Sequence, residues 1–126
     1  MSLVRVASLL LLAVPAAASA QSMNADTFYQ KGLALKKKGP LAIFSGDLKP
    51  LMSEGQAAGK AAGLARRAAL KAGAKPRYCP PAEVKGMAST EFFDRLARIP
   101  QPVRRQIDMT EATNRILAGE YPCKAG

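Results

Sequence analysis

The sequence contains no histidine among its 126 residues. Histidine is the side chain most often used for proton transfer at neutral pH, because its unperturbed pKa lies closest to that pH. Its absence excludes Ser–His and Cys–His nucleophile pairs. No Ser-x-x-Lys sequence occurs, and no glycine-rich phosphate loop ends in Lys-Ser or Lys-Thr. Paired carboxylates stay open, but most acidic residues occupy positions typical of helix caps. We therefore expect a protein that is not an enzyme and needs no cofactor or metal.

Aromatic residues are few, with four Phe, three Tyr and no Trp, and acidic residues are fewer than basic ones. The 19 Lys and Arg residues against nine Asp and Glu give a formal net charge of +10. Such an excess favours acidic partners, namely anionic lipid, nucleic acid or an acidic protein surface. Binding of single-stranded nucleic acid also needs aromatic rings that stack on bases, whereas the Phe and Tyr residues here are spaced mostly like core residues. We expect no nucleic-acid partner.

Long hydrophobic runs are also lacking. The apolar stretch over residues 6–14 follows one positive charge at Arg5 and is broken by Pro15. It is too short for a membrane anchor, since spanning a bilayer takes about 20 apolar residues. Ala18 and Ala20 place small residues at the two positions that a signal peptidase reads, which predicts cleavage before Gln21. We predict a secretory signal peptide over residues 1–20 and a single domain over residues 21–126, exported to the periplasm.

The only cysteines are Cys79 and Cys123. An exported chain enters an oxidising compartment, in which disulfides persist. The alternatives are a metal pair or a nucleophilic cysteine with a spare, but a structural zinc site normally needs four Cys or His ligands. The compartment and the even count predict a disulfide, which would close a loop of about 45 residues and contribute up to ~4 kcal/mol.

Proline and glycine divide the chain after residue 20 into four to five helical pieces, and no stretch alternates apolar and polar residues for long enough to predict a sheet. The sequence predicts an all-α fold, a small orthogonal or bundle-like array of these helices with one disulfide. We expect Asn24 or Asp26, Asp47 and Asp108 to cap helices and Gly119 to end the last one. Helices are expected over residues 25–37, 48–72, 89–99 and 109–118, with turns packed at 41–44 and 103–107.

The helix over residues 48–72 is amphipathic, with a basic stripe opposite a row of small residues. At about 100° per residue, one narrow face carries Lys49, Gln56, Lys60, Arg67 and Lys71. The opposite face carries Leu51, Ala58, Ala62, Ala65 and Ala69. The stripe is a candidate interaction face, although a solvated surface is the plainer interpretation. A helix that lies on a membrane would oppose its charges with large apolar residues, and this one opposes them with alanine.

Three glycines, Gly55, Gly59 and Gly63, recur every four residues along the same helix. Each is expected to reduce helix stability by up to ~1 kcal/mol relative to alanine, so a compensating contact is expected. Three interpretations remain: close packing of another helix of the chain, most naturally through Phe28 or Leu35; self-association into a homodimer; or a flexible spacer. We call these glycines the glycine ladder. The first interpretation predicts that Gly59→Ala destabilises the protein.

The C-terminal half carries a pattern of cysteines, prolines and two helices. Its ends are Cys79-Pro80-Pro81 and Tyr121-Pro122-Cys123, and it contains the following segments in order: Glu91-Phe92-Phe93, Leu96, Ile99-Pro100 and Ala112 to Ala118. This half resembles the Tai-type immunity family, periplasmic helical proteins that neutralise amidase toxins delivered by type VI secretion. The resemblance spans residues 79–123 and implies a bond between Cys79 and Cys123. Family members carry a second cysteine pair in the N-terminal half, which this chain lacks.

These observations lead to two functional hypotheses. The first is a periplasmic binding or inhibitor protein of the immunity type, whose partner would be a protein such as a secreted amidase toxin. The second is an exported, envelope-associated structural or interaction protein that applies its basic helix face to anionic surfaces. No transmembrane segment is expected in the mature chain.

Overall fold

The computed structural model describes residues 22–124, so the predicted signal peptide lies outside the described part of the chain. The described residues form helices and no strand, and the all-α prediction with one disulfide is confirmed. The helical segments are α1 (Ala25–Lys37), the 3-10 helix η1 (Gly39–Phe44), α2 (Leu48–Lys71), α3 (Ser89–Arg98), α4 (Gln101–Arg104) and α5 (Met109–Glu120).

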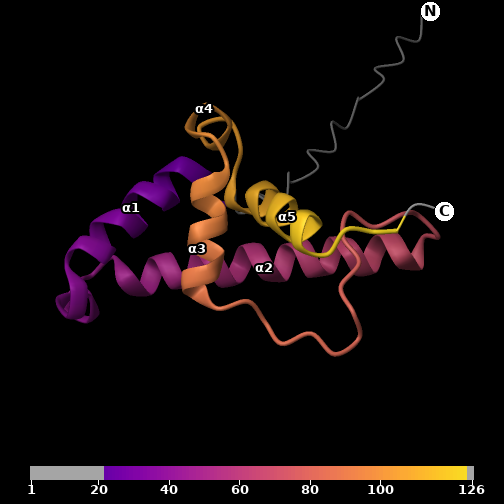
Figure 1. Ribbon diagram of the computed structural model, residues 1–126, viewed down its shortest axis with the longest axis horizontal. Coiled ribbons are helices and arrows are strands. Elements are labelled where there is room, and N and C mark those ends of the chain that lie inside the picture. The colour runs from indigo at the N-terminus through magenta and orange to yellow at the C-terminus, as the bar shows by residue number, and fades with distance from the viewer. Residues whose placement is uncertain (1–21, 125–126) are drawn as a thin grey trace, which may run out of the picture.

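The long helix α2 contacts α1, η1 and α5, whereas α3 packs on α1 and α5. In Figure 1, α1 and α5 lie on the same side of α2, and α3 passes across α2 in this view. The most extensive helix contact is between α2 and α5. A loop over residues 72–88 leaves the end of α2 and returns below it to the start of α3 (Figure 1).

Local sequence signals explain the starts of α1 and α5. The Asn24 carboxamide oxygen accepts the backbone N–H groups of Asp26 at 3.0 Å and Thr27 at 3.1 Å, and the Asp108 carboxylate accepts that of Glu111 at 2.8 Å. Each satisfies free N–H groups of a first turn. Asp47 stands at the start of α2, but its side chain makes no capping hydrogen bond. The prediction that Asp47 caps this helix is therefore wrong.

The last helix extends past the glycine that was expected to end it. Gly119 lies inside α5, which continues to Glu120, and its φ is not positive. A glycine stops a helix efficiently when it adopts the left-handed conformation. Here Tyr121 follows instead and donates its N–H to the Leu117 carbonyl at 2.8 Å.

The starts of α1 and α5 are joined by a short antiparallel bridge between Asn24 and Asp108. The Ala25 N–H donates to the Ile107 carbonyl at 2.9 Å, and the Met109 N–H donates to the Met23 carbonyl at 2.7 Å. Two helices far apart in sequence therefore begin from one fixed point.

The core is small and is built where α2 carries alanine. Ala58 and Ala62 on α2 are fully buried, as are Leu96 of α3 and Met109 of α5. Small side chains on α2 let α5 approach it closely, and the gain is dispersion and apolar burial. The predicted apolar face of α2 is thus correct at Leu51, Ala58 and Ala62, whereas Ala65 is exposed.

One ion pair is buried beside this core and joins α4 to α1. Arg104 Nε lies 3.1 Å from the Asp26 carboxylate, and its guanidinium carbon lies 4.0 Å from the centre of the Tyr29 ring. Burial alone would raise the pKa of Asp26. Hydrogen bonds from Arg104, Gln101 and Gln30 outweigh that effect and lower the pKa below its ordinary value. The carboxylate is therefore held in its charged form.

The turn after α1 differs from the expectation that it packs on the core. Residues 41–44 are indeed helical, within η1, but Leu41, Ile43 and Phe44 are 67%, 70% and 81% exposed. Only Ala42 of this turn packs against the core. These side chains are exposed because η1 connects α1 and α2 at one end of the molecule and packs on those two helices (Figure 1).

Candidate functional site

An apolar groove runs between α1, α2, α3 and α5. Its volume is about 590 Å³, within the range of about 300–1,000 Å³ that is typical of ligand pockets. Gly55 and Gly59 of α2 line the part that we call its floor, and Phe92 and Phe93 of α3 line the part that we call its wall. Phe28 of α1 also lines the groove. The groove is open to solvent along one side.

The glycine ladder meets its neighbours unevenly. A methyl group at Gly55 would lie 3.6 Å from the Phe28 ring, which is ordinary contact, so α1 does pack here through Phe28 as expected. A methyl group at Gly59 would meet nothing within 4 Å, and one at Gly63 would meet only the Arg67 guanidinium at 3.8 Å. Within the described chain no helix covers the ladder beyond Gly55, and Gly55 and Gly59 line the open groove.

The glycine that is tightly packed lies on α1. A methyl group at Gly32 would overlap the ring of Phe93, whose Cζ would be 3.0 Å away. That ring is stacked on Tyr29 with 5.0 Å between centroids, so it has little room to shift. Gly32 therefore lets α3 approach α1 and sets the position of the groove wall.

The basic stripe lies on the face of α2 next to the glycine ladder. Lys49, Lys60, Arg67 and Lys71 are all exposed, and helix geometry places the glycine ladder between them and the buried alanines. None of these four side chains lines the groove, whose charged lining residues are Lys36 of α1 and Asp94 of α3. The groove thus has a mostly apolar lining with one charge of each sign, and the excess positive charge on the adjoining face of α2 favours an acidic and apolar occupant over a basic one.

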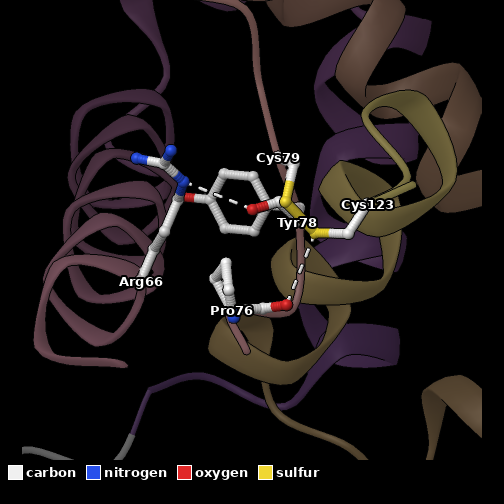
Figure 2. Close-up of a disulfide and its surroundings, with 5 residues drawn as sticks. All are labelled: Arg66, Pro76, Tyr78, Cys79 and Cys123. Carbon is white, nitrogen blue, oxygen red and sulfur yellow. Dashed lines mark hydrogen bonds between the residues drawn. A yellow bond between two sulfur atoms is a disulfide. The ribbon is translucent and has the colours of Figure 1, made fainter. Parts of the chain in front are cut away.

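The disulfide holds the C-terminal half together behind this groove. Cys79 and Cys123 are bonded, with 4.9 Å between their Cα atoms, and the Cys79 N–H donates to the Tyr121 carbonyl at 2.8 Å. Figure 2 shows this bond next to Tyr78, whose carbonyl accepts Arg66 Nε of α2 at 3.2 Å. The bond therefore ties the loop and the tail to each other, and Arg66 ties both to α2.

A charged cluster on α5 fixes the same loop. Arg77 donates from both terminal nitrogens to the two carboxylate oxygens of Glu111, one of these bonds measuring 2.9 Å, and Arg115 Nε donates to Glu111 at 3.0 Å. The hydrogen bonds from Arg77, followed in importance by those from Arg115, lower the pKa of Glu111 to about 2 despite its partial burial. Arg77, Glu111 and Arg115 are hydrogen-bonded to one another, which is typical of charged residues that stabilise a fold.

Among the described residues, no three Cys, Asp or Glu side chains gather into a group that could hold a metal ion. No buried side-chain nitrogen or oxygen between residues 22 and 124 lacks a hydrogen-bond partner. The described helices include none that is long and apolar enough to cross a bilayer.

The sequence singled out Gly55 and Gly59 as a surface for another helix and not as part of an open groove. The groove is also lined by Phe92 and Phe93 of α3 and by Met87 in the preceding loop. Those residues have ordinary core-like spacing, and nothing local shows that α3 packs on α1 and α5 at this point. Comparison of the chain with protein-family models, curated proteins and solved structures finds no match.

Proposed function

We propose that this chain is an exported binding protein that holds a protein partner in the groove over Gly55 and Gly59. The observation that carries the proposal is the open groove itself. Glycines reduce the stability of α2, and at Gly59 no group of the described chain makes use of the space. A partner backbone that enters the groove would supply the missing contact.

The chemistry of the groove favours an acidic, apolar segment of the partner. Phe28, Phe92 and Met52 offer apolar contact. Lys36 offers a cation at the groove edge, and the basic stripe adds positive charge on the neighbouring face of α2. Apolar anchors in a desolvated centre supply most of the affinity of such interfaces, while charges at the rim set specificity and association rate. A helix laid in a groove is a recurring form of this recognition.

The resemblance to the Tai-type immunity family names a partner class, a secreted amidase toxin. The bonded cysteines lie at the ends of the segment that carries this resemblance, residues 79–123. In this proposal the protein acts in the periplasm as an inhibitor, and the partner's active site or its border would be blocked by the groove surface.

The test fills the groove without disturbing the fold. Gly59→Leu places a side chain into open space, and Ala68→Leu places the same side chain on an exposed position of α2 away from the groove. We expect the wild-type protein and Ala68→Leu to capture the same protein from a periplasmic extract. Gly59→Leu should lose at least roughly tenfold in affinity for it, in line with the penalty for overfilling a packed contact.

The inhibitor role has its own measurement. The captured protein should hydrolyse peptide bonds of peptidoglycan, and the wild-type chain should stop that activity at a stoichiometric ratio while Gly59→Leu does not. If Gly59→Leu captures the same protein as the wild type with equal affinity, the groove is not the binding surface. If the captured protein has no such activity, the amidase assignment is wrong and the binding role stands.

A further inference from the structure

Three large apolar side chains project from η1 at one end of the molecule. Leu41, Ile43 and Phe44 are 67%, 70% and 81% exposed, and Phe44 is the most exposed of the large hydrophobic side chains in the described chain. We call these three residues the η1 tip. In Figure 1 the turn that bears them lies at the end of the long dimension opposite the C-terminus. Clustered exposed apolar side chains of this kind mark an interaction site.

Lysines flank the tip on both sides along the sequence. Lys36 and Lys37 end α1, Lys38 follows as its C-cap, and Lys49 lies in the first turn of α2; all four are exposed. We call these four residues the lysine collar. Asp47 is the one acidic residue within residues 36–49, so this segment has a net charge of +3. Lys38 Nζ donates to Ser45 Oγ at 3.3 Å, which holds that cation beside the tip.

We propose that the η1 tip and the lysine collar bind an anionic phospholipid surface. The apolar side chains would enter the boundary between headgroups and acyl chains, and the lysines would contact the lipid phosphates while their methylene stems follow the apolar side chains inward. The proposed contact is with the surface of the bilayer. The η1 tip is separate from the groove floor, and Lys36 is the collar residue that also lines the groove.

Charge favours lipid over a second copy of the chain. Two copies that met through their tips would bring two lysine collars together, and like charges at short range oppose association. An anionic bilayer instead offers a negative charge for each lysine, and each contact near such a surface raises affinity about fivefold. A helix that lies on a membrane needs large apolar residues opposite its charges, and α2 has alanine there. The η1 tip differs from α2 in this respect, because it supplies large apolar side chains.

Vesicle binding by the mature protein tests the proposal. Phosphatidylglycerol vesicles should retain the protein in co-sedimentation at low ionic strength, phosphatidylcholine vesicles should not, and added salt should release it. Ile43→Ser with Phe44→Ser should weaken binding roughly tenfold or more, because two exposed anchors are lost. Leu64→Ser with Leu70→Ser removes two large apolar side chains of α2 that are 52% and 49% exposed, and it should leave binding unchanged.

Charge reversal tests the collar in the same way. Lys37→Glu with Lys38→Glu should weaken binding to phosphatidylglycerol vesicles roughly tenfold or more. Lys75→Glu with Lys85→Glu makes the same change in net charge within the exposed 72–88 loop, and it should have a clearly smaller effect. Equal losses in the two variants would show that net charge alone drives binding, which would overturn the proposed site.

Insertion of the tip can be observed directly because the chain contains no Trp. Phe44→Trp should give an emission spectrum that shifts to the blue on phosphatidylglycerol vesicles, and Leu64→Trp should not shift. Circular dichroism and sedimentation velocity establish that each variant is folded and whether it self-associates. Identical spectral behaviour of the two Trp variants, or a tip variant that alters oligomeric state but not vesicle binding, would overturn the proposal. Capture of the groove partner should be unaffected by any tip variant, so the two proposals fail separately.

Discussion

At the scale of single residues, glycine has opposite roles at two positions of the same groove. A methyl group at Gly59 meets nothing, whereas one at Gly32 would overlap the Phe93 ring. Gly59→Ala should therefore stabilise the isolated protein by up to ~1 kcal/mol through helix propensity. Gly32→Ala should destabilise it by about 1–3 kcal/mol through overpacking. This reverses the sign expected from the sequence for Gly59→Ala.

Urea denaturation of the two variants and the wild type measures both effects. A loss of stability in Gly59→Ala together with a change in oligomeric state would mean that a second copy fills the ladder. A neutral Gly32→Ala would mean that the Phe93 ring moves freely, and that α3 is not held at the distance described.

Glu111 gives a second prediction at this scale, in its dependence on pH. Its pKa falls from an ordinary value of 4.5 to about 2 in the folded protein. The unfolded chain therefore binds the proton more readily, so the stabilisation is fully present above pH 4.5 and is lost as the pH falls toward 2. The melting temperature of Glu111→Gln should be lower than that of the wild type at neutral pH, and the difference should shrink between pH 4.5 and 2. Arg77→Gln should show a smaller pH effect than the wild type.

Thermal melts across this pH range, followed by circular dichroism, make the measurement. A difference between wild type and Glu111→Gln that stays constant from pH 7 to 2 would show that the carboxylate is not held by Arg77 and Arg115. Both partners are partly exposed, so salt should reduce the effect as well.

At the scale of elements, the sequence predicted what local chemistry dictates. Asn24 and Asp108 cap helices because an oxygen side chain sits beside free N–H groups, and proline and glycine mark the breaks between helices. The predictions that Asp47 caps α2 and that Gly119 ends α5 are wrong. The backbone conformation at each position decides whether the residue caps or ends a helix, and sequence spacing does not reveal that conformation. The prediction that the turn over residues 41–44 packs on the core is wrong for a related reason, because an apolar turn is buried only if another element covers it.

In the candidate site, too, the sequence predicts the arrangement of residues within one helix and does not predict contacts between helices. Gly55, Gly59 and the basic stripe share one helix, so their mutual arrangement follows from a repeat of 100° per residue. The position of Phe92 and Phe93 depends on how α3 packs on α1 and α5, which is a property of the tertiary structure. The buried pair of Asp26 and Arg104, 78 residues apart, was missed for the same reason: no local pattern relates the two charges.

Loss of the disulfide should reduce the stability of the protein more than the other changes considered. It joins the 72–88 loop to the segment after α5, and the hydrogen bond from Cys79 to Tyr121 repeats that link. Replacing either Cys79 or Cys123 by Ser should destabilise the protein by ~2–5 kcal/mol. Reduction of the wild type should have a comparable effect, and both are measured by urea denaturation. Two titratable thiols in protein purified from the periplasm without reductant would contradict the bond.

At the scale of the whole molecule, the two proposed surfaces correspond to the two functional hypotheses from the sequence, binding of a protein and binding of an anionic surface. The groove over Gly55 and Gly59 suits a protein segment, and the η1 tip with its collar suits a lipid surface. Both lie toward the end of the molecule where α1 meets α2, whereas the disulfide and the Glu111 cluster fix the C-terminal half. A protein held at the membrane by the tip would present the groove to partners that enter the periplasm.

The central claim is that the groove binds a different protein, and site-specific photo-crosslinking tests it most directly. A photoreactive amino acid at Gly59 occupies open space in the groove, and the same group at Ala68 lies on an exposed part of α2 outside it. Irradiation of intact cells should yield a covalent adduct with one heterologous protein from position 59 and not from position 68. An adduct of two copies of this chain, equal labelling from both positions, or no adduct from position 59 would contradict the claim.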